Sequence, residues 1–164
     1  MRFLLSASLS AALLSSGAMA AEVTIETAQG DVTLEQPSRV AVLDVGVADT
    51  LQALGVTPVA VTDKMYLDHL QSLAGIRAVR TLQEPNLEKL AEVGPDLIVV
   101  ANRSAVKKDS VAVIAPAIDM TVDGADLIND AKARLTAFAT LFGKEAEGEA
   151  LLATLDGKLA ALKE

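Results

Sequence analysis

Apolar and polar positions are arranged in two ways that predict strands. Residues 23–27 and 31–34 alternate apolar with polar side chains and flank Gln29 and Gly30, which predicts a short antiparallel hairpin. Further along, the apolar positions are continuous, as in strands that are buried on both faces. These expected buried strands cover residues 39–44, 58–61, 78–79, 96–101 and 117–121.

Between the buried strands, apolar residues recur with the spacing of an amphipathic helix. Gly55 and Gly94 each follow such a segment as a C-terminal cap would, and Asn86 precedes one as an N-terminal cap. Strands that alternate with helices over short connections predict an α/β fold, namely a Rossmann-like parallel sheet flanked by helices. The expected helices cover residues 47–54, 65–73, 87–93, 104–114 and 126–142.

Ligands of parallel α/β sheets bind at the carboxyl ends of the strands. The connections that start there begin at Asp44, Thr62, Arg80, Ala101 and Thr121. Any ligand-binding residues are therefore expected in these five connections.

Three cationic residues follow buried strands and are expected to gather at this edge. They are Lys64, Arg80 and Arg103. Either they are ordinary surface charges, or they form a positive pocket for an anion in an otherwise acidic protein. Arginine suits the second role because its planar guanidinium donates paired hydrogen bonds to oxygen acceptors.

The last segment, residues 144–164, has the pattern of a long helix. Its apolar stripe lies at residues 151, 152, 155, 159 and 162. A compact domain rarely ends on so regular a helix without something for the stripe to cover. We therefore expect the chain to be one part of a larger protein.

The first twenty residues have the features of a cleavable export signal. Arg2 precedes an apolar run that is too short to span a bilayer, and Ala18, Met19 and Ala20 form the small-x-small pattern read by signal peptidase. Cleavage after Ala20 would place the protein in the periplasm.

The composition narrows the function classes. A formal net charge of −8 argues against a nucleic-acid partner, and an aromatic content of 2% argues against stacking on bases. With no cysteine, the sequence lacks disulfides, thiolate metal sites and a cysteine nucleophile. No motif for nucleophilic catalysis is present, so no catalytic residue is assigned. The single histidine, His69, is read as a solvated helix residue, with a metal or ligand contact as the alternative.

Four landmarks lie in order along the chain, at residues 40–55, 82–90, 95–104 and 142–145. Together they resemble the periplasmic binding proteins of iron-siderophore ABC importers. The chain looks most like the members that bind ferric catecholate-type siderophores. The resemblance implies two Rossmann-like lobes joined by a long helix, with the ligand in the cleft between them. Residues 21–143 would then be the N-terminal lobe and residues 144–164 the joining helix, with the C-terminal lobe absent from this chain.

The resemblance also implies roles for single residues. Arg103 matches the arginine that reaches the siderophore oxygens in catecholate binders, and Lys64 and Arg80 fall on cleft loops with a weaker match. Glu88 matches the glutamate by which related cobalamin-binding proteins dock onto the membrane permease. The implied partners are thus a ferric siderophore and an ABC permease at the inner membrane.

The chemistry of the ligand fits the scarcity of metal ligands. A ferric tris-catecholate is anionic and its iron is already coordinated, so the protein needs cationic donors and space, and no metal ligand or cofactor of its own. Four alternatives remain open: a binding protein for a free metal ion that uses His69, one for haem or cobalamin, a small periplasmic hydrolase, and a nonfunctional truncated fragment.

Overall fold

A computed structural model describes residues 21–63, 67–73, 75–79, 81 and 84–162. Strands β1 (Glu22–Thr27) and β2 (Gly30–Glu35) form the antiparallel hairpin that the alternation predicts. The other strands form a parallel sheet in the order β5-β4-β3-β6-β7. These strands are β3 (Val40–Val42), β4 (Ala60–Val61), β5 (Arg77–Ala78), β6 (Leu97–Val100) and β7 (Ala117–Asp119).

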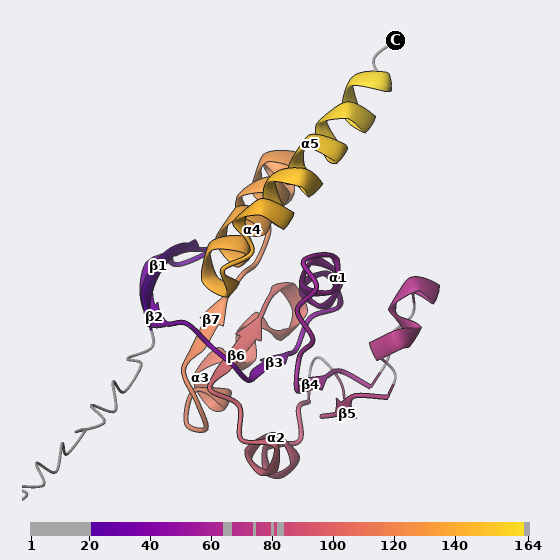
Figure 1. The fold of residues 1–164 in the computed structure, drawn as a ribbon. Coiled ribbons are helices and arrows are strands. Elements are labelled where there is room, and N and C mark those ends of the chain that lie inside the picture. The colour runs from indigo at the N-terminus through magenta and orange to yellow at the C-terminus, as the bar shows by residue number, and fades with distance from the viewer. Residues whose placement is uncertain (1–20, 64–66, 74, 80, 82–83, 163–164) are drawn as a thin grey trace, which may run out of the picture.

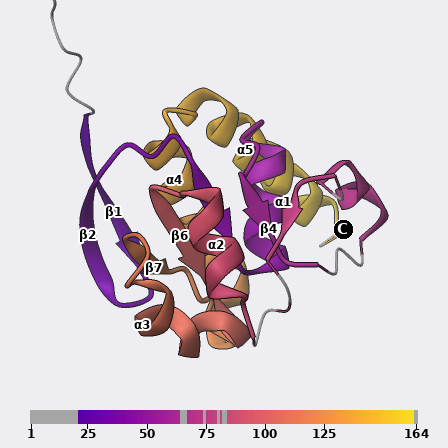
Figure 2. The same cartoon turned by 90° about the horizontal axis from the view of Figure 1, so that it is seen from below.

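Helices cover both faces of this sheet, which confirms the predicted α/β class (Figures 1 and 2). Residues that alternate along β3 and β6 enter two separate cores. Val42 and Val99 face the core formed with α1 (Val45–Ala53), α4 (Leu127–Phe142) and the hairpin. Leu43 and Val100 face the core formed with α2 (Leu87–Val93) and α3 (Lys108–Val111). Each of these fully buried apolar side chains stabilises the fold by about 1.5–3 kcal/mol.

Local capping signals position the helices around the strands. The Asn86 side chain accepts a hydrogen bond from the amide of Lys89 at 2.8 Å, and Gly94 ends α2 in the left-handed region at φ 61°. The predicted bounds of α2 are therefore confirmed to the residue. The side chain of Asp44 accepts from the amide of Val47 at 2.9 Å, so α1 begins two residues before the predicted start.

The predicted helix over residues 104–114 is only partly correct. The segment forms a 3₁₀ helix, η2 (Asn102–Lys107), followed by the short α3. The buried Ser104 hydroxyl accepts from the amide of Ala101 and donates to its carbonyl, both at 3.0 Å. The amide of Ser104 also donates to the carbonyl of Ala101 at 3.0 Å, which is the i→i+3 backbone bond of a 3₁₀ helix. The hydroxyl bonds hold the same four-residue turn closed.

Two further segments differ in part from the predicted helices. The residues of the expected helix 65–73 that the structure describes form a 3₁₀ helix, η1 (Asp68–Leu73). A single 3₁₀ turn, η3 (Gly124–Asp126), precedes α4, so α4 begins one residue later than predicted.

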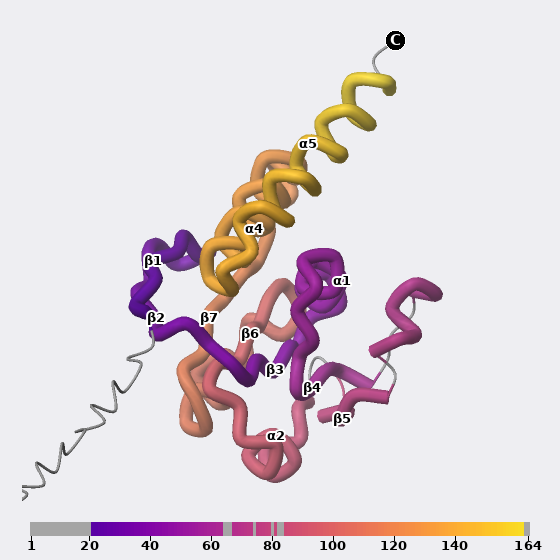
Figure 3. The backbone as a smooth tube through the Cα atoms, in the orientation of Figure 1, coloured from indigo at the N-terminus to yellow at the C-terminus, as the bar shows by residue number. Residues whose placement is uncertain are grey.

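The last helix, α5 (Glu145–Ala161), packs against α4 and then extends beyond the rest of the fold (Figures 1 and 3). Leu151 of the predicted stripe packs on the core, whereas Leu162 at the far end is 83% exposed. The other three leucines of the stripe, Leu152, Leu155 and Leu159, are half-buried, so only the far end of the stripe is exposed. No helix in the described part of the chain is long and apolar enough to cross a membrane.

Candidate ligand-binding site at the carboxyl edge of the sheet

Arg103 lies where β6 ends, as the second residue of η2, and is exposed. The residue before it, Asn102, has a φ of 49° and is the only non-glycine residue with a positive φ in the described ranges. Asparagine tolerates this left-handed conformation better than most residues. The backbone therefore turns sharply at Asn102 and places Arg103 at the carboxyl edge, where ligands of such sheets collect.

Hydrogen bonds to both neighbouring strand ends hold this turn. The amide of Asn102 donates to Oγ1 of Thr121 at 2.8 Å, just after β7. Its side-chain Nδ2 donates to Oδ2 of Asp44 at 3.2 Å, just after β3. The backbone immediately before Arg103 is thus tied to the strands on either side of β6.

Two buried carboxylates lie beneath the turn. Asp44 is 7% exposed and Asp119 is 8% exposed. Asp119 accepts from the Thr121 hydroxyl at 2.6 Å and from its amide at 3.0 Å. Hydrogen bonds therefore run without a break from Asp44 through Asn102 and Thr121 to Asp119.

The side chain of Arg134, on α4, lies close to these hydrogen-bonded residues. One of its terminal nitrogens donates to the carbonyl of Met120. A Cβ atom added to Gly46 would lie 3.2 Å from Oδ1 of Asp44 and 3.4 Å from Nη1 of Arg134, so the two side chains flank the same point. Burial lowers the pKa of the guanidinium, and the charges of Asp44 and Asp119 act in the opposite direction. Arginine stays protonated in proteins, so the group keeps its positive charge.

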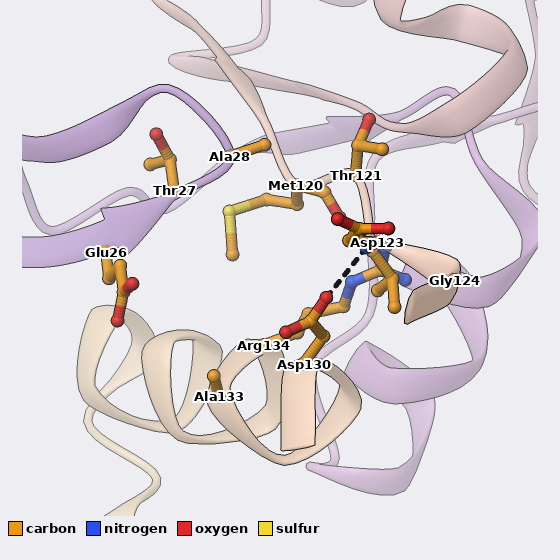
Figure 4. A pocket seen from close by; sticks show the side chains of 11 residues that line it. Glu26, Thr27, Ala28, Met120, Thr121, Asp123, Gly124, Asp130, Ala133 and Arg134 are labelled. Carbon is orange, nitrogen blue, oxygen red and sulfur yellow. Dashed lines mark hydrogen bonds between the residues drawn. The ribbon is translucent and has the colours of Figure 1, made fainter. Parts of the chain in front are cut away.

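A hollow of about 580 Å³ opens beside Arg134, between β1 and the connection from β7 to α4 (Figure 4). The side chain of Met120 points into it. Its charged lining residues are three carboxylates and one guanidinium, so its charge does not suit an anion, and the turn with Arg103 remains the candidate site. These charged residues are Glu26, Asp123, Asp130 and Arg134.

The other residues singled out from the sequence lie apart from this turn or outside the described ranges. Lys64 and Arg80 are among the residues that the structure does not describe. Glu88 is exposed in the first turn of α2. His69 lies on the surface with its side chain 60% exposed, and its Nε2 is 2.9 Å from Oδ1 of Asp49 on α1. Among the described residues, no group of three or more His, Cys, Asp or Glu side chains could hold a metal ion.

Sequence reasoning named Thr121 only as the start of a connection and missed three other residues of the edge, namely Asn102, Asp119 and Arg134. A signal for Arg134 was present, because it is four residues before Phe138 and seven before Leu141, both fully buried. That spacing places an arginine on the apolar face of α4. An arginine in that position needs acceptors or counter-charges, which are found at the sheet edge.

A sequence model of the periplasmic binding protein family matches residues 40–164, and this chain belongs to that family. The petrobactin-binding protein YclQ of Bacillus subtilis is 32% identical over 133 residues, which cover 79% of this chain and 42% of YclQ. The solved structure of YclQ matches with a TM-score of 0.81 at 27% identity, over 87% of this chain and 53% of that one.

Two other solved structures match to a similar extent. The periplasmic catecholate-siderophore binding protein VctP of Vibrio cholerae has a TM-score of 0.78 at 30% identity, over 86% of this chain and 52% of VctP. The iron uptake ABC transporter substrate-binding protein PiuA of Streptococcus pneumoniae has a TM-score of 0.79 at 31% identity, over 85% of this chain and 51% of PiuA. The family and these relatives are substrate-binding proteins and not enzymes. This chain spans about half the length of the relatives it matches.

Proposed function

We propose that this chain is the solute-binding part of an ABC importer that captures an anionic, catecholate-type ferric siderophore in the periplasm. The observation that carries the proposal is the exposed Arg103, presented at the carboxyl edge by a turn that is tied to both neighbouring strands. Relatives of the same family are named for petrobactin and for a catecholate siderophore. Lys64 and Arg80 follow other strands in the sequence and would add positive charge at the same edge.

The domain organisation belongs to the same proposal. Residues 1–20 act as a cleaved export signal, residues 21–143 form the N-terminal lobe, and residues 144–164 form the helix that joins it to a second lobe. The partial match to each relative and the extension of α5 beyond the fold support this organisation. Glu88, exposed on α2, contacts the membrane permease when the loaded protein delivers its ligand.

Binding by this chain tests the ligand class. The chain is titrated by calorimetry with a ferric catecholate siderophore, the iron-free siderophore, haem, cobalamin and zinc. We expect heat of binding with the ferric catecholate and none with the other four. Preferential binding of haem, cobalamin or zinc would contradict the proposal, and binding of none of the five would favour a nonfunctional fragment.

Substitution of Arg103 tests the site. Because a hydrogen bond to a charged group contributes about 1.5–3 kcal/mol, Arg103→Ala should raise the dissociation constant roughly ten- to hundredfold. The matched control is Arg77→Ala, which removes an exposed arginine at the amino end of β5 whose ion pair with Glu92 is exposed and contributes little. Equal affinities for the two variants would remove Arg103 from the site.

A further inference from the structure

The proposed ligand is an anion, yet the edge that would receive it rests on two buried carboxylates. Asp44 and Asp119 lie beneath the turn that carries Arg103, and the whole chain has a formal net charge of −8. Charges shielded from solvent act over longer distances than exposed ones, because less water and salt screens them. Without a counter-charge, the two carboxylates would oppose the binding that Arg103 promotes.

Arg134 supplies a positive charge at this place. It comes from α4, more than thirty residues along the chain from Arg103, and its side chain is half-buried. Its direct hydrogen bond goes to the carbonyl of Met120, and its Nη1 and Oδ1 of Asp44 flank the same point beside Gly46. Arg134 therefore acts on Asp44, and also on Asp119, through space. The hydrogen bonds from Asp44 through Asn102 and Thr121 to Asp119 join the two carboxylates into one group, with Arg134 acting on both.

We infer that Arg134 determines the ligand charge that this edge accepts, because it compensates Asp44 and Asp119 without touching the ligand. The inference rests on the proposed function and adds a residue to it. Arg103 donates to the ligand. Arg134 is a positioning residue in the electrostatic sense, because it reduces the negative charge of the group formed by Asp44 and Asp119 from two units to one. Loss of Arg134 should therefore weaken anionic ligands selectively.

The test compares two ferric-type complexes of opposite charge. Gallium(III) replaces iron because it is diamagnetic, which lets weak binding be followed by amide NMR shifts. One probe is the anionic gallium complex of a tris-catecholate, and the other is the cationic gallium complex of desferrioxamine B. A unit charge about 10 Å from a bound ion changes its affinity by roughly tenfold at an effective dielectric constant near 20.

Three variants separate compensation from a merely structural role. Arg134→Met should weaken the anionic complex about tenfold and leave the cationic complex unchanged or tighter. Asp119→Asn should have the opposite effect and tighten binding of the anionic complex, because it removes a negative charge. The turn should keep its structure, since the amide oxygen can still accept from Thr121. The double variant, Arg134→Met with Asp119→Asn, restores the net charge of the edge and should bind the anion about as well as the parent.

The control is Lys132→Met, which removes one positive charge from the same helix at a residue paired with Asp156 of α5. It should change neither affinity appreciably. If Arg134→Met fails to fold by circular dichroism, Arg134→Gln, whose side-chain amide can still donate to the carbonyl of Met120, replaces it in the single and the double variant.

The outcomes distinguish the two claims. Suppose that the parent binds the anionic complex. The inference alone would then be overturned if Arg134→Met affected both complexes equally, or if the double variant did not recover the parent's affinity. A parent that binds neither complex, or only the cationic one, would overturn the proposed function and the inference with it.

Discussion

Gly148 is the point at which α5 crosses α4, and its substitution by alanine should destabilise the fold. Gly148 is the buried residue of α5. A Cβ atom there would lie 2.6 Å from Cβ of Ala139 and 3.9 Å from Cδ2 of Leu54. Carbon atoms pack at about 3.5–4.0 Å, so the added methyl group would force the two helices roughly 1 Å apart.

Two opposing effects set the magnitude. Overpacking of this kind destabilises the fold by about 1–3 kcal/mol. Here the two Cβ atoms are fixed by their helix backbones and cannot rotate away from each other. Alanine is favoured over glycine in a helix by about 0.5–1 kcal/mol, which offsets part of the loss. We expect a net loss of about 1–2 kcal/mol for Gly148→Ala, and hence a fall in Tm of about 2–8 °C for a chain of this size.

Gly157 provides a matched control in the same helix. A Cβ atom added there meets no atom within 4 Å. Gly157→Ala should therefore show the helix-propensity gain alone and raise stability by about 0.5–1 kcal/mol. Urea and thermal unfolding followed by circular dichroism measure both variants. If Gly148→Ala is as stable as the parent or more so, the close approach of α4 and α5 does not limit the packing there.

Three further predictions concern charge and assembly. Partial burial raises the pKa of Asp96, but hydrogen bonds from Ser38 and from the amide of Arg39 outweigh it and hold that pKa below its ordinary value. Asp96 should thus stabilise the fold above about pH 4 and lose this effect on further acidification, so Asp96→Asn should lower the urea midpoint at pH 7 and have a smaller effect at about pH 3. Glu88→Ala should leave the dissociation constant for the ferric siderophore unchanged but reduce its uptake by cells, and normal uptake would exclude the docking role. The chain by itself should bind a ferric catecholate weakly and self-associate through the exposed end of α5, and submicromolar binding by a monomer in light scattering would contradict both parts.

The sequence predicts those parts of the fold that short-range interactions determine. The bounds of α2 were predicted to the residue because its N-terminal cap, the bond between Asn86 and the amide of Lys89, spans three residues. The C-terminal glycine of α2 follows directly after its last residue. The turn of the hairpin is equally local, since it is formed at Gly30, whose φ is 97°. Such signals can be read in a single sequence without knowing what packs against them.

The sequence does not predict the carboxyl edge in the same way, since its bonds join residues that are far apart in the chain. Asn102 and Asp44 are 58 positions apart, and Asn102 and Thr121 are 19 apart. Only the order β5-β4-β3-β6-β7, which places β6 between β3 and β7, brings these residues together. The sequence could indicate that a loop follows each strand, but not which polar side chains of two loops meet.

The helix after β6, which was predicted only in part, shows how short-range propensity and long-range contacts compete. Ala105, Lys107 and Lys108 all favour a regular helix, and local propensity alone would form one. Asn102 instead bonds to the ends of two neighbouring strands, and the buried Ser104 bonds back to Ala101. These contacts outweigh propensity and form a 3₁₀ turn with Arg103 at its exposed start. Disagreement between local preference and tertiary contacts is expected at functional or strained sites, so this turn is a suitable place to test the proposed role of Arg103.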